Sequence, residues 1–394
     1  MDARRIKTVA LVVERTRAFG RGLCEGVITY AQGRDDWALR FLSVADLRRR
    51  ERREGVDGFI ARVTSDAVAR ALASTGRPVV DIYYQKPYPG FAVVKTNHER
   101  LGAIAAAHLL ERRFRNFAYC PYGGGRTSRY CQTSFVRHLK RAGFSCAVCR
   151  RSAEAGYELD DDSVIGETID RPRDAARLAR WLRSLPKPVA VFCPGDLMAW
   201  QLIAICRDAG MAVPREVAVL GVDNDILLCG SSRPMLTSID PDARRIGRVA
   251  AETLEQMIDA PAARAAVRVV APAGIVPRAS TETAPVDPPW LADALVFIWR
   301  NARNGISAAD VYARLGRSHT SVTAAFHAVL GTTVQREIAN TRLEEAKRLL
   351  VDTGLDVAEI AKLTGFKSAS YLHQAFTAAL GVSAGSWRRL NARR

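Results

Sequence analysis

The C-terminal quarter of the sequence holds one helix–turn–helix pattern written twice, and this repeat constrains the fold more than any other feature. The copies occupy residues 307–331 and 356–381. They are offset by 49 residues before the turn and by 50 after it, so the second turn is one residue longer. The matched positions are Val311 with Ile360, Gly316 with Gly365, Val322 with Leu372, Phe326 with Phe376 and Gly331 with Gly381. Such paired units are typical of proteins that insert recognition helices into DNA grooves.

Capping residues predict where these helices begin. Ser307 with Asp310, and Asp356 with Glu359, are cap-plus-acid pairs three residues apart, which satisfy the free N–H groups of a first helical turn. Thr332 is expected to open the helix that joins the two copies.

Apolar spacing divides each second helix into a buried and an outward face. The predicted buried stripes are Val322, Phe326, Val329 and Leu330 in the first copy and Leu372, Phe376 and Ala379 in the second. The predicted DNA contacts are Arg317, His319, Thr320 and Thr323, and then Lys367, Ser370, Tyr371, His373 and Gln374. Gln374 suits an adenine edge, whereas Arg317 and Lys367 suit phosphates. Each polar residue alone would be read as a solvated helix face, but the shared pattern favours a DNA interface.

Composition limits the remaining choices. The 394 residues are 48% hydrophobic and 25% charged, as in a soluble protein of several domains. The net charge of +17 favours a polyanionic partner, although residues 290–394 contribute only +6 of it. We expect a cytoplasmic protein, because the sequence shows no secretory signal and no apolar run long enough to cross a membrane. Of the eight cysteines, Cys146 and Cys149 form one isolated Cys-x-x-Cys, so neither a metal nor a cofactor is expected.

Residues 7–275 alternate short β-branched runs with helical stretches, which predicts an α/β region with parallel sheets. The expected strands are Val9–Val13, Ala38–Leu42, Gly58–Ala61, Val79–Ile82, Ala92–Lys95, Phe117–Tyr119, Ala190–Phe192 and Val217–Val222. The expected helices are Phe19–Tyr30, Leu101–Arg112, Ser134–Ala142, Asp174–Leu182, Leu197–Asp208 and Arg244–Asp259.

Ligands of open α/β sheets bind beyond the carboxyl ends of the strands. Asp223 and Asn224 directly follow a predicted strand, and their oxygens suit the vicinal hydroxyls of a polyol. An Asx turn that satisfies its own backbone explains the same residues equally well. Arg126 and Arg129 give another of these loops a basic rim.

Three segments resemble the sensor domains of LacI/GalR regulators: Val219–Asp225 with the following Arg233–Asp240, Phe19–Gly26, and Thr96–Gly102. The resemblance spans residues 5–279 and implies two α/β lobes of the periplasmic-binding type, with a ligand in the cleft between them. It adds Phe19, Asn97 and Asp196 to the implied ligand contacts. The sequence departs from the family at Asn97, which replaces a common acid, and at Cys131, which stands where an arginine often reads sugar hydroxyls.

Residues 290–392 closely resemble the AraC/XylS DNA-binding domain, through the repeat, the segment 365–372 and the closing 380–387. Ala324 and Ala384 depart from that family, since an arginine and a proline are usual there. The expected organisation is a ligand-sensing domain over 1–278, a proline-containing linker over 279–289 and an all-α reader domain over 290–394.

The two resemblances together imply a non-enzymatic transcription regulator, most simply an activator, that binds a double-stranded DNA operator. They imply a small sugar as effector, with xylose or a related pentose first, and a homodimer that acts with RNA polymerase without contacting a membrane. A periplasmic-type sugar-binding protein would share the sensor fold but would have no use for residues 290–394. A carbohydrate-active enzyme is the other alternative, although no nucleophile–base pair or metal-ligand spacing is evident in the sequence.

Overall fold

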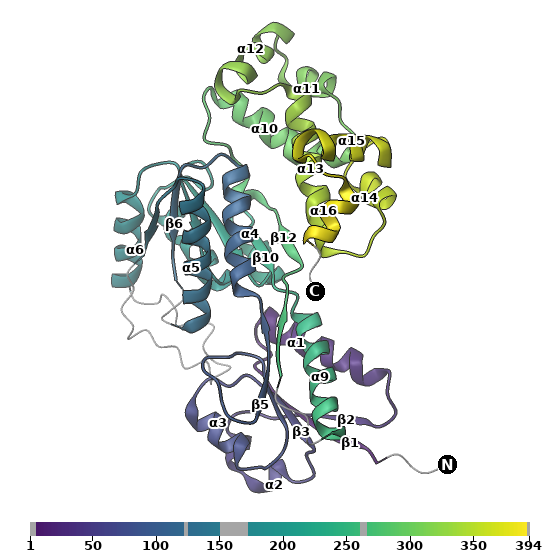
Figure 1. Ribbon diagram of the computed structural model, residues 1–394. Helices are drawn as coiled ribbons and strands as arrows, with labels where there is room; N and C mark the ends of the chain where they lie inside the picture. The colour runs from purple at the N-terminus through teal and green to yellow at the C-terminus, as the bar shows by residue number, and fades with distance from the viewer. Residues whose placement is uncertain (1–4, 122–124, 150–171, 261–265, 392–394) are drawn as a thin grey trace. The chain divides into compact units, whose positions relative to one another are not determined.

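The computed structural model describes residues 5–121, 125–149, 172–260 and 266–391. Contacts divide the chain into two units (Figure 1). The first unit comprises Met1–Glu111 and Arg115–Thr281, and the second comprises Arg112–Phe114 and Glu282–Arg394. The first unit is α/β and the second is helical, as the sequence predicts.

The first lobe of the α/β unit is a parallel sheet in the order β11-β5-β4-β3-β1-β2. Its strands are β1 (Lys7–Val12), β2 (Trp37–Phe41), β3 (Gly58–Ala61), β4 (Val79–Asp81), β5 (Phe91–Thr96) and β11 (Val267–Val270). Its helices are α1 (Ala18–Gln32), α2 (Arg50–Arg53), α3 (Asp66–Ala73) and α9 (Ala243–Asp259). Side chains alternate along β1, because Val9 and Leu11 pack against α1 and α9 while Ala10 and Val12 join the core under α3.

The second lobe is a sheet in the order β12-β10-β9-β8-β6-β7, parallel except for β12. Its strands are β6 (Asn116–Tyr119), β7 (Cys146–Val148), β8 (Val189–Phe192), β9 (Val217–Val222), β10 (Thr237–Asp240) and β12 (Gly274–Val276). Its helices are α4 (His98–Glu111), α5 (Arg126–Arg141), α6 (Pro172–Ser184), α7 (Asp196–Asp208) and α8 (Ile226–Ser231). Helices α4 and α5 run side by side in Figure 1 and pack closely.

The chain passes between the lobes at three points, which gives the two-lobed topology that the sequence predicts. It crosses after β5 into α4, after β10 into α9, and between β11 and β12. Eight of the strands lie where alternation and apolar runs predict them. The structure adds β7, β10, β11 and β12, which are short and lie at or next to a sheet edge or beside a crossover, where apolar patterning is weakest.

The helical unit contains two small cores joined by one long helix. Its elements are α10 (Pro289–Asn301), α11 (Ala308–Leu315), α12 (His319–Leu330), α13 (Val334–Asp352), α14 (Val357–Leu363), α15 (Ala369–Leu380) and α16 (Ala384–Asn391). Helix α13 contributes Val334 and Ile338 to the core under α12, and Leu343, Ala346 and Leu350 to the core under α15. Each helix–turn–helix copy therefore has its own core, and α13 belongs to both.

The expected linker over 279–289 is shorter in the structure. Residues Ala279–Thr281 form a 3₁₀ turn in which Ser280 and Thr281 are fully buried in the second lobe. The Ser280 hydroxyl donates to the Val219 carbonyl at 2.6 Å and accepts from the Thr237 amide at 2.8 Å. Ala284 already belongs to the core of the helical unit. Buried hydroxyls with hydrogen-bond partners explain why a polar, proline-rich stretch is not simply an extended connector.

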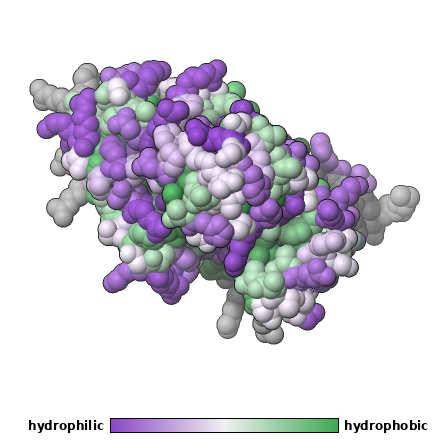
Figure 2. Space-filling view, turned by 90° about the horizontal axis from the view of Figure 1, so that it is seen from above, coloured by the Kyte–Doolittle hydropathy of each residue, from purple (hydrophilic) through white to green (hydrophobic). Residues whose placement is uncertain are grey.

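Within the described residues, no helix is long and apolar enough to cross a membrane. Hydrophilic and hydrophobic side chains are interspersed over the face shown in Figure 2.

The contact between α1 and α9 depends on glycine. A Cβ atom on Gly247 would lie 2.0 Å from the carbonyl oxygen of Leu23, which is backbone and cannot move aside. Gly247→Ala should therefore lower the unfolding free energy of the α/β unit by about 1–3 kcal/mol. Urea unfolding followed by circular dichroism measures this loss. Gly230→Ala is the matched control, because a Cβ atom on that helical residue meets nothing within 4 Å; equal stability of the two variants would contradict the packing described.

Candidate functional site: a ligand cleft and a DNA interface

The loop after β9 presents carboxylates at the carboxyl end of the second sheet. Asp223 and Asn224 have positive backbone φ angles of 109° and 48°, which residues other than glycine rarely adopt. The Asp223 amide donates to the Ile239 carbonyl at 2.9 Å, and the Asn224 amide donates to the Ser238 hydroxyl at 3.0 Å. Backbone strain held in place by such contacts is typical of binding and catalytic loops.

The buried side chain of Asp196 holds the loop after β9 in place. It is 1% exposed, and its carboxylate accepts hydrogen bonds from the Ser238 hydroxyl at 2.6 Å and from the Asp225 amide at 2.7 Å. Burial raises the pKa of Asp196 to about 7, although these donors oppose the shift. A Cβ atom on Gly221 would lie 2.1 Å from an oxygen of Asp196, so glycine is needed beside it. The sequence predicts Asp196 as a ligand contact, whereas its contacts in the structure are those of a positioning residue.

Asp223 offers an open acceptor. Among the described residues, none donates a hydrogen bond to its carboxylate. Burial and the neighbouring Asp196 raise the pKa of Asp223, while Arg62 and Arg17 oppose the shift. Cys131 also lies within electrostatic range of Asp223, and burial raises the pKa of this thiol to about 12. The thiol of Cys131 is therefore neutral at pH 7, at the position where the resemblance to the sensor family implies an arginine.

Arg62 is a cleft residue that the sequence analysis missed. It follows β3 directly and forms an ion pair with Glu14, which lies in the loop after β1. Its guanidinium lies 4.4 Å from the centroid of the Tyr83 ring, and its Nε is buried without a hydrogen-bond partner in the structure described. A buried donor without a partner calls for an explanation, and a ligand acceptor supplies one. Its place directly after a predicted strand was the available signal.

Asp225 is a second missed residue, and it joins the two lobes. It is 6% exposed and caps α8 by accepting from the amides of Leu227 and Leu228. Its other oxygen accepts from the Ala18 amide in the first lobe at 3.2 Å and lies 3.5 Å from the guanidinium of Arg21. The Asx-turn reading of this segment therefore holds for Asp225, while Asp223 remains open.

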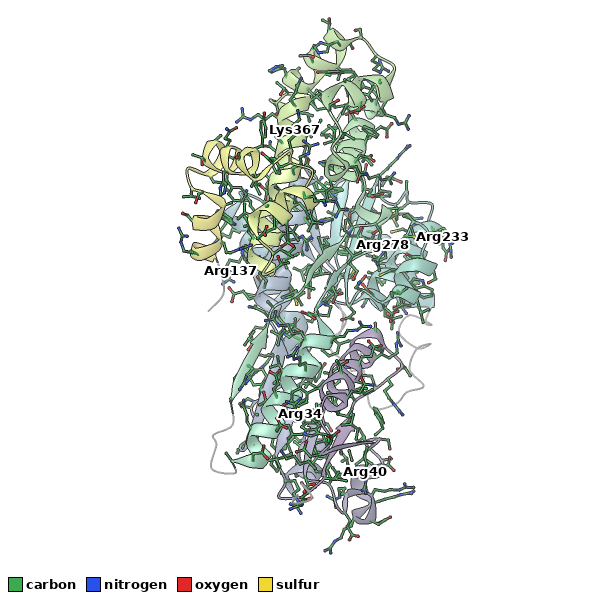
Figure 3. All side chains as sticks on the ribbon, turned by 90° about the vertical axis from the view of Figure 1, so that its right-hand side faces the viewer. Arg34, Arg40, Arg137, Arg233, Arg278 and Lys367 are labelled. Carbon is green, nitrogen blue, oxygen red and sulfur yellow. The ribbon has the colours of Figure 1, made fainter. Side chains whose placement is uncertain are left out.

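Asn224 and Asn97, both expected at the ligand, use their side chains within the protein. The Asn224 amide oxygen accepts from Arg278 at 2.7 Å, and its NH₂ donates to Asp240 at 3.3 Å. Arg278 is labelled in the second lobe in Figure 3. The Asn97 side chain accepts from the Arg100 amide at 2.9 Å and so caps α4. Local capping and a charged partner explain both residues without a ligand.

The other predicted ligand contacts, Phe19, Arg126 and Arg129, differ in their surroundings. Phe19 packs partly buried against the core of the first lobe. Arg126 begins α5, and its amide donates to the side chain of Gln85 in the first lobe at 3.2 Å. Arg129 is exposed, and no contact between it and Asp223 is found in the described part of the chain.

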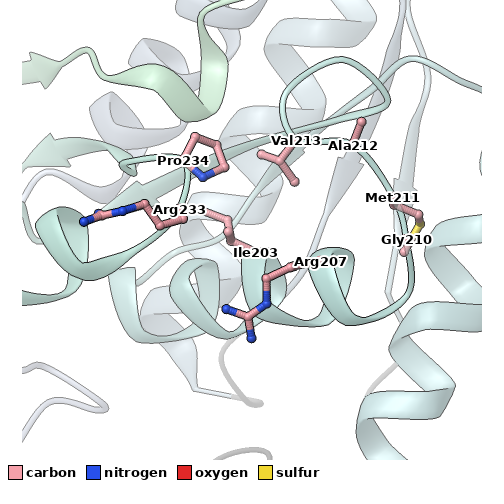
Figure 4. A pocket seen from close by; sticks show the side chains of 8 residues that line it. All are labelled: Ile203, Arg207, Gly210, Met211, Ala212, Val213, Arg233 and Pro234. Atoms are coloured by element: carbon pink, nitrogen blue, oxygen red, sulfur yellow. The ribbon is translucent and has the colours of Figure 1, made fainter.

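A surface pocket of about 300 Å³ lies elsewhere in the second lobe (Figure 4). Its lining residues are Ile203, Arg207, Gly210, Met211, Ala212, Val213, Arg233 and Pro234. Ile203 and Arg207 lie on α7, and the other lining residues belong to the loops before β9 and β10. The pocket therefore lies at the amino ends of those strands, whereas the Asp223 loop follows the carboxyl end of β9. Across the described residues, no group of three or more His, Cys, Asp or Glu side chains has the geometry to hold a metal ion.

The two helix–turn–helix copies are nearly identical in local structure. Ser318 and Ser368 cap α12 and α15, and the burial of residues 319–330 repeats at 369–380 in all positions but the first. Val322, Phe326, Leu372 and Phe376 are fully buried, as predicted. Val329 and Ala379 are exposed, contrary to prediction, because they lie at the C-terminal end of each helix, beyond its last fully buried residue. Thr333 caps α13, one residue beyond the expected Thr332.

The predicted DNA contacts lie on the outward face of the second helices and in the turns before them. The exposed ones are Arg317, His319, Thr320, Lys367, Ser370, Tyr371 and Gln374, while Thr323 and His373 are half-buried. Lys367 is labelled on the helical unit in Figure 3. In the first copy, His319 packs on Tyr312 at 4.3 Å between ring centroids, and Arg317 lies 4.8 Å from the Trp290 ring.

Arg388 on α16 has a structural role. Its guanidinium donates to the Leu350 carbonyl at 3.1 Å and to the carbonyl of Leu355. It therefore ties α16 to the end of α13.

Comparison with known proteins agrees with both halves of this description. A family model described as a periplasmic binding protein-like domain matches residues 106–281, and one described as a helix-turn-helix domain matches residues 311–390. The chain therefore joins a periplasmic-binding-protein-like domain to a helix-turn-helix domain.

Individual proteins resemble the chain along its whole length. The xylose operon regulatory protein of Escherichia coli (strain K12) is 25% identical over 395 residues, covering 97% of each chain. A solved structure of a xylose-binding transcription activator covers 100% of both chains, with 24% identity and a TM-score of 0.61. A LacI family regulator from Enterococcus faecium with bound ribose covers 71% of this chain and 99% of its own, with 23% identity and a TM-score of 0.55. The two structural matches establish the fold. The full-length relative is named as a regulator and not as an enzyme.

A substitution at Phe376 tests the core of the second copy. It is fully buried and lies 6.2 Å from the Trp387 ring. Phe376→Ala should destabilise this core by about 3–5 kcal/mol through lost burial and the cavity left behind. Hydrogen exchange should then show faster opening of α14, α15 and α16 than in the wild-type chain. Tyr371→Ala, at a position 55% exposed on the same helix, is the control and should leave exchange nearly unchanged.

Proposed function

We propose that the chain is a cytoplasmic, homodimeric transcription activator that binds an operator through both helix–turn–helix copies and responds to a small sugar in the sensor cleft. The observation that carries this proposal is the open Asp223 carboxylate in the cleft of a chain that also bears two outward recognition helices. The full-length relative named as a xylose operon regulator makes xylose, or a related pentose, the first effector to test.

The spacing of the copies supports binding in successive major grooves. Helix α13 has 19 residues and is therefore about 28 Å long. One turn of B-DNA separates successive major grooves by about 34–36 Å. A rigid helix of this length, with one core at each end, holds α12 and α15 at a comparable separation.

The second copy carries the larger outward side chains. Its helix presents Tyr371 and Gln374, whereas the matched positions in the first copy are Ser321 and Ala324. We therefore assign base reading mainly to α15 and anchoring to α12. Two chains bound at adjacent half-sites would bring the surface of one chain close to RNA polymerase. We propose that this contact activates transcription.

The ligand side rests on complementary chemistry. Asp223 supplies an acceptor for hydroxyl groups, and the buried Nε of Arg62 supplies a donor. Sugar hydroxyls both donate and accept, so this pair matches a polyol. Asp225, in the same loop, contacts both lobes. A ligand bound to Asp223 would therefore act on the loop that holds the two lobes together.

Gln374→Ala tests base reading. Loss of a bidentate adenine contact should reduce discrimination at one operator position by about 1–3 kcal/mol while non-specific affinity changes little. Binding of an operator and of its single-base variants, measured at several salt concentrations, separates these effects. Lys367→Gln is the contrasting variant and should weaken all sequences alike, with a salt slope smaller by about 1. A uniform loss for Gln374→Ala would make Gln374 a phosphate contact.

Asp223→Ala tests the sensor. A ligand at 100 times its dissociation constant stabilises the folded chain by about 2.7 kcal/mol, so a panel of aldopentoses and hexoses, each with its sugar acid, should raise the melting temperature of the wild-type protein. The variant should lose this response and still bind DNA without sugar. Asp208→Ala, which removes an exposed carboxylate far from the loop, should keep it. A sugar response that survives in Asp223→Ala would remove Asp223 from the site.

A further inference from the structure

Two cations from opposite lobes approach one aromatic ring in the cleft. Lys95 lies at the carboxyl end of β5 in the first lobe, and Arg126 begins α5 in the second. The ammonium of Lys95 lies 3.9 Å from the centroid of the Tyr84 ring, and the Arg126 guanidinium lies 5.9 Å from the same centroid. Tyr130 on α5 lies on another side of Lys95, 5.8 Å from its ammonium. Residues of both lobes thus form one cationic, aromatic cluster.

Within the part of the chain that the structure describes, no carboxylate forms an ion pair with the cations of this cluster. Among the described residues, neither Lys95 nor Arg126 forms a salt bridge. Burial, and then the charge of Arg126, lower the pKa of Lys95. Burial and the charge of Lys95 lower the pKa of the neighbouring His98 to about 4, so this imidazole is neutral at pH 7. Over residues 5–121, 125–149, 172–260 and 266–391, the charged groups that shift the pKa values of Lys95 and His98 are therefore cations alone.

Three carboxylates of the loops at the strand ends are engaged by other partners. Glu14 pairs with Arg62, and Asp225 is occupied by α8 and the first lobe. Asp81 accepts from the amides of Val63, Tyr83 and Tyr84. These bonds hold Tyr84 at a left-handed φ of 56°, so the platform beneath Lys95 is built by a strained turn.

We propose that Lys95 and Arg126, with Tyr84 and Tyr130, form a subsite for an anionic group of the effector, so that the sensor prefers a pentose acid or pentose phosphate to the neutral sugar. This inference rests on the proposed function, in which Asp223 and Arg62 hold the hydroxyl groups. The adjacent tyrosines connect the two ends, since Tyr83 contacts Arg62 and Tyr84 contacts Lys95. A carboxylate or phosphate forms charge-assisted hydrogen bonds with both cations.

The position of the subsite gives the anion a role in closing the cleft. Lys95 and Arg126 belong to different lobes, so their repulsion opposes closure when the cleft holds no anion. An anion between them replaces that repulsion with two attractions. It therefore binds the closed arrangement more tightly than the open one, which is the condition for a ligand to shift the equilibrium.

Matched sugars test the charge preference. The probes are D-xylose against D-xylonate, and D-ribose against D-ribose 5-phosphate, with inorganic phosphate alone as the control for general anion binding. Isothermal titration of the full chain should show about tenfold or more tighter binding of one anionic member than of its neutral partner. The carboxylate and phosphate arms identify which anion the subsite takes. Raised salt should weaken the anionic member more than the neutral one.

Variants of the cluster complete the test. Lys95→Gln and Arg126→Gln should each bring the ratio of anionic to neutral affinity close to one, whereas Lys140→Gln, an exposed control on α5, should keep the wild-type ratio. Equal affinity for neutral and anionic sugars in the wild-type chain would overturn the inference and leave the proposed function standing. If no sugar of either kind binds, the proposed sugar-sensing function fails as well. Binding of inorganic phosphate as tight as that of the sugar phosphate would also overturn the inference.

Discussion

The buried carboxylate of Asp196 organises the ligand end of the sensor domain. Its oxygens accept from the backbone of Asp225 and from the hydroxyl of Ser238, which itself accepts from the amide of Asn224. These bonds hold two successive residues at positive φ and leave Asp223 without a donor. Because Asp225 also reaches the first lobe, the same loop serves ligand binding and lobe contact. One buried acid thus sets the geometry on which the effector response depends.

The pattern of the sequence predicted the architecture well where patterning is strong. Unbroken apolar runs predicted the bounds of β3 and β9 to the residue. The repeat predicted both recognition helices, because the matched Phe326 and Phe376 mark the buried face of each helix. Short elements such as β11 were missed, because Arg268 interrupts its apolar residues and the strand has only four positions. The start of α5 was also missed, since its first turns are polar.

The site was predicted less completely, for a physical reason. A sequence shows which residues follow strands, and this rule led to Asp223 and Arg126, which stay predicted ligand contacts. It does not show which polar groups satisfy one another, so Asn224 and Asn97 were expected at the ligand although Arg278 and the α4 backbone engage them. Arg62 was overlooked because its importance lies in an unpartnered Nε, which only the fold reveals.

Helix α13 gives the DNA-binding unit an unusual kind of cooperativity. Since its first half belongs to one core and its second half to the other, neither copy can unfold without fraying a helix that the other copy needs. The unit therefore behaves as a two-repeat array, in which the free energy of each repeat is coupled through a shared interface. Partial unfolding of one copy should therefore weaken the binding of the other copy to DNA. Operator affinity would then depend on the local stability at both ends of α13.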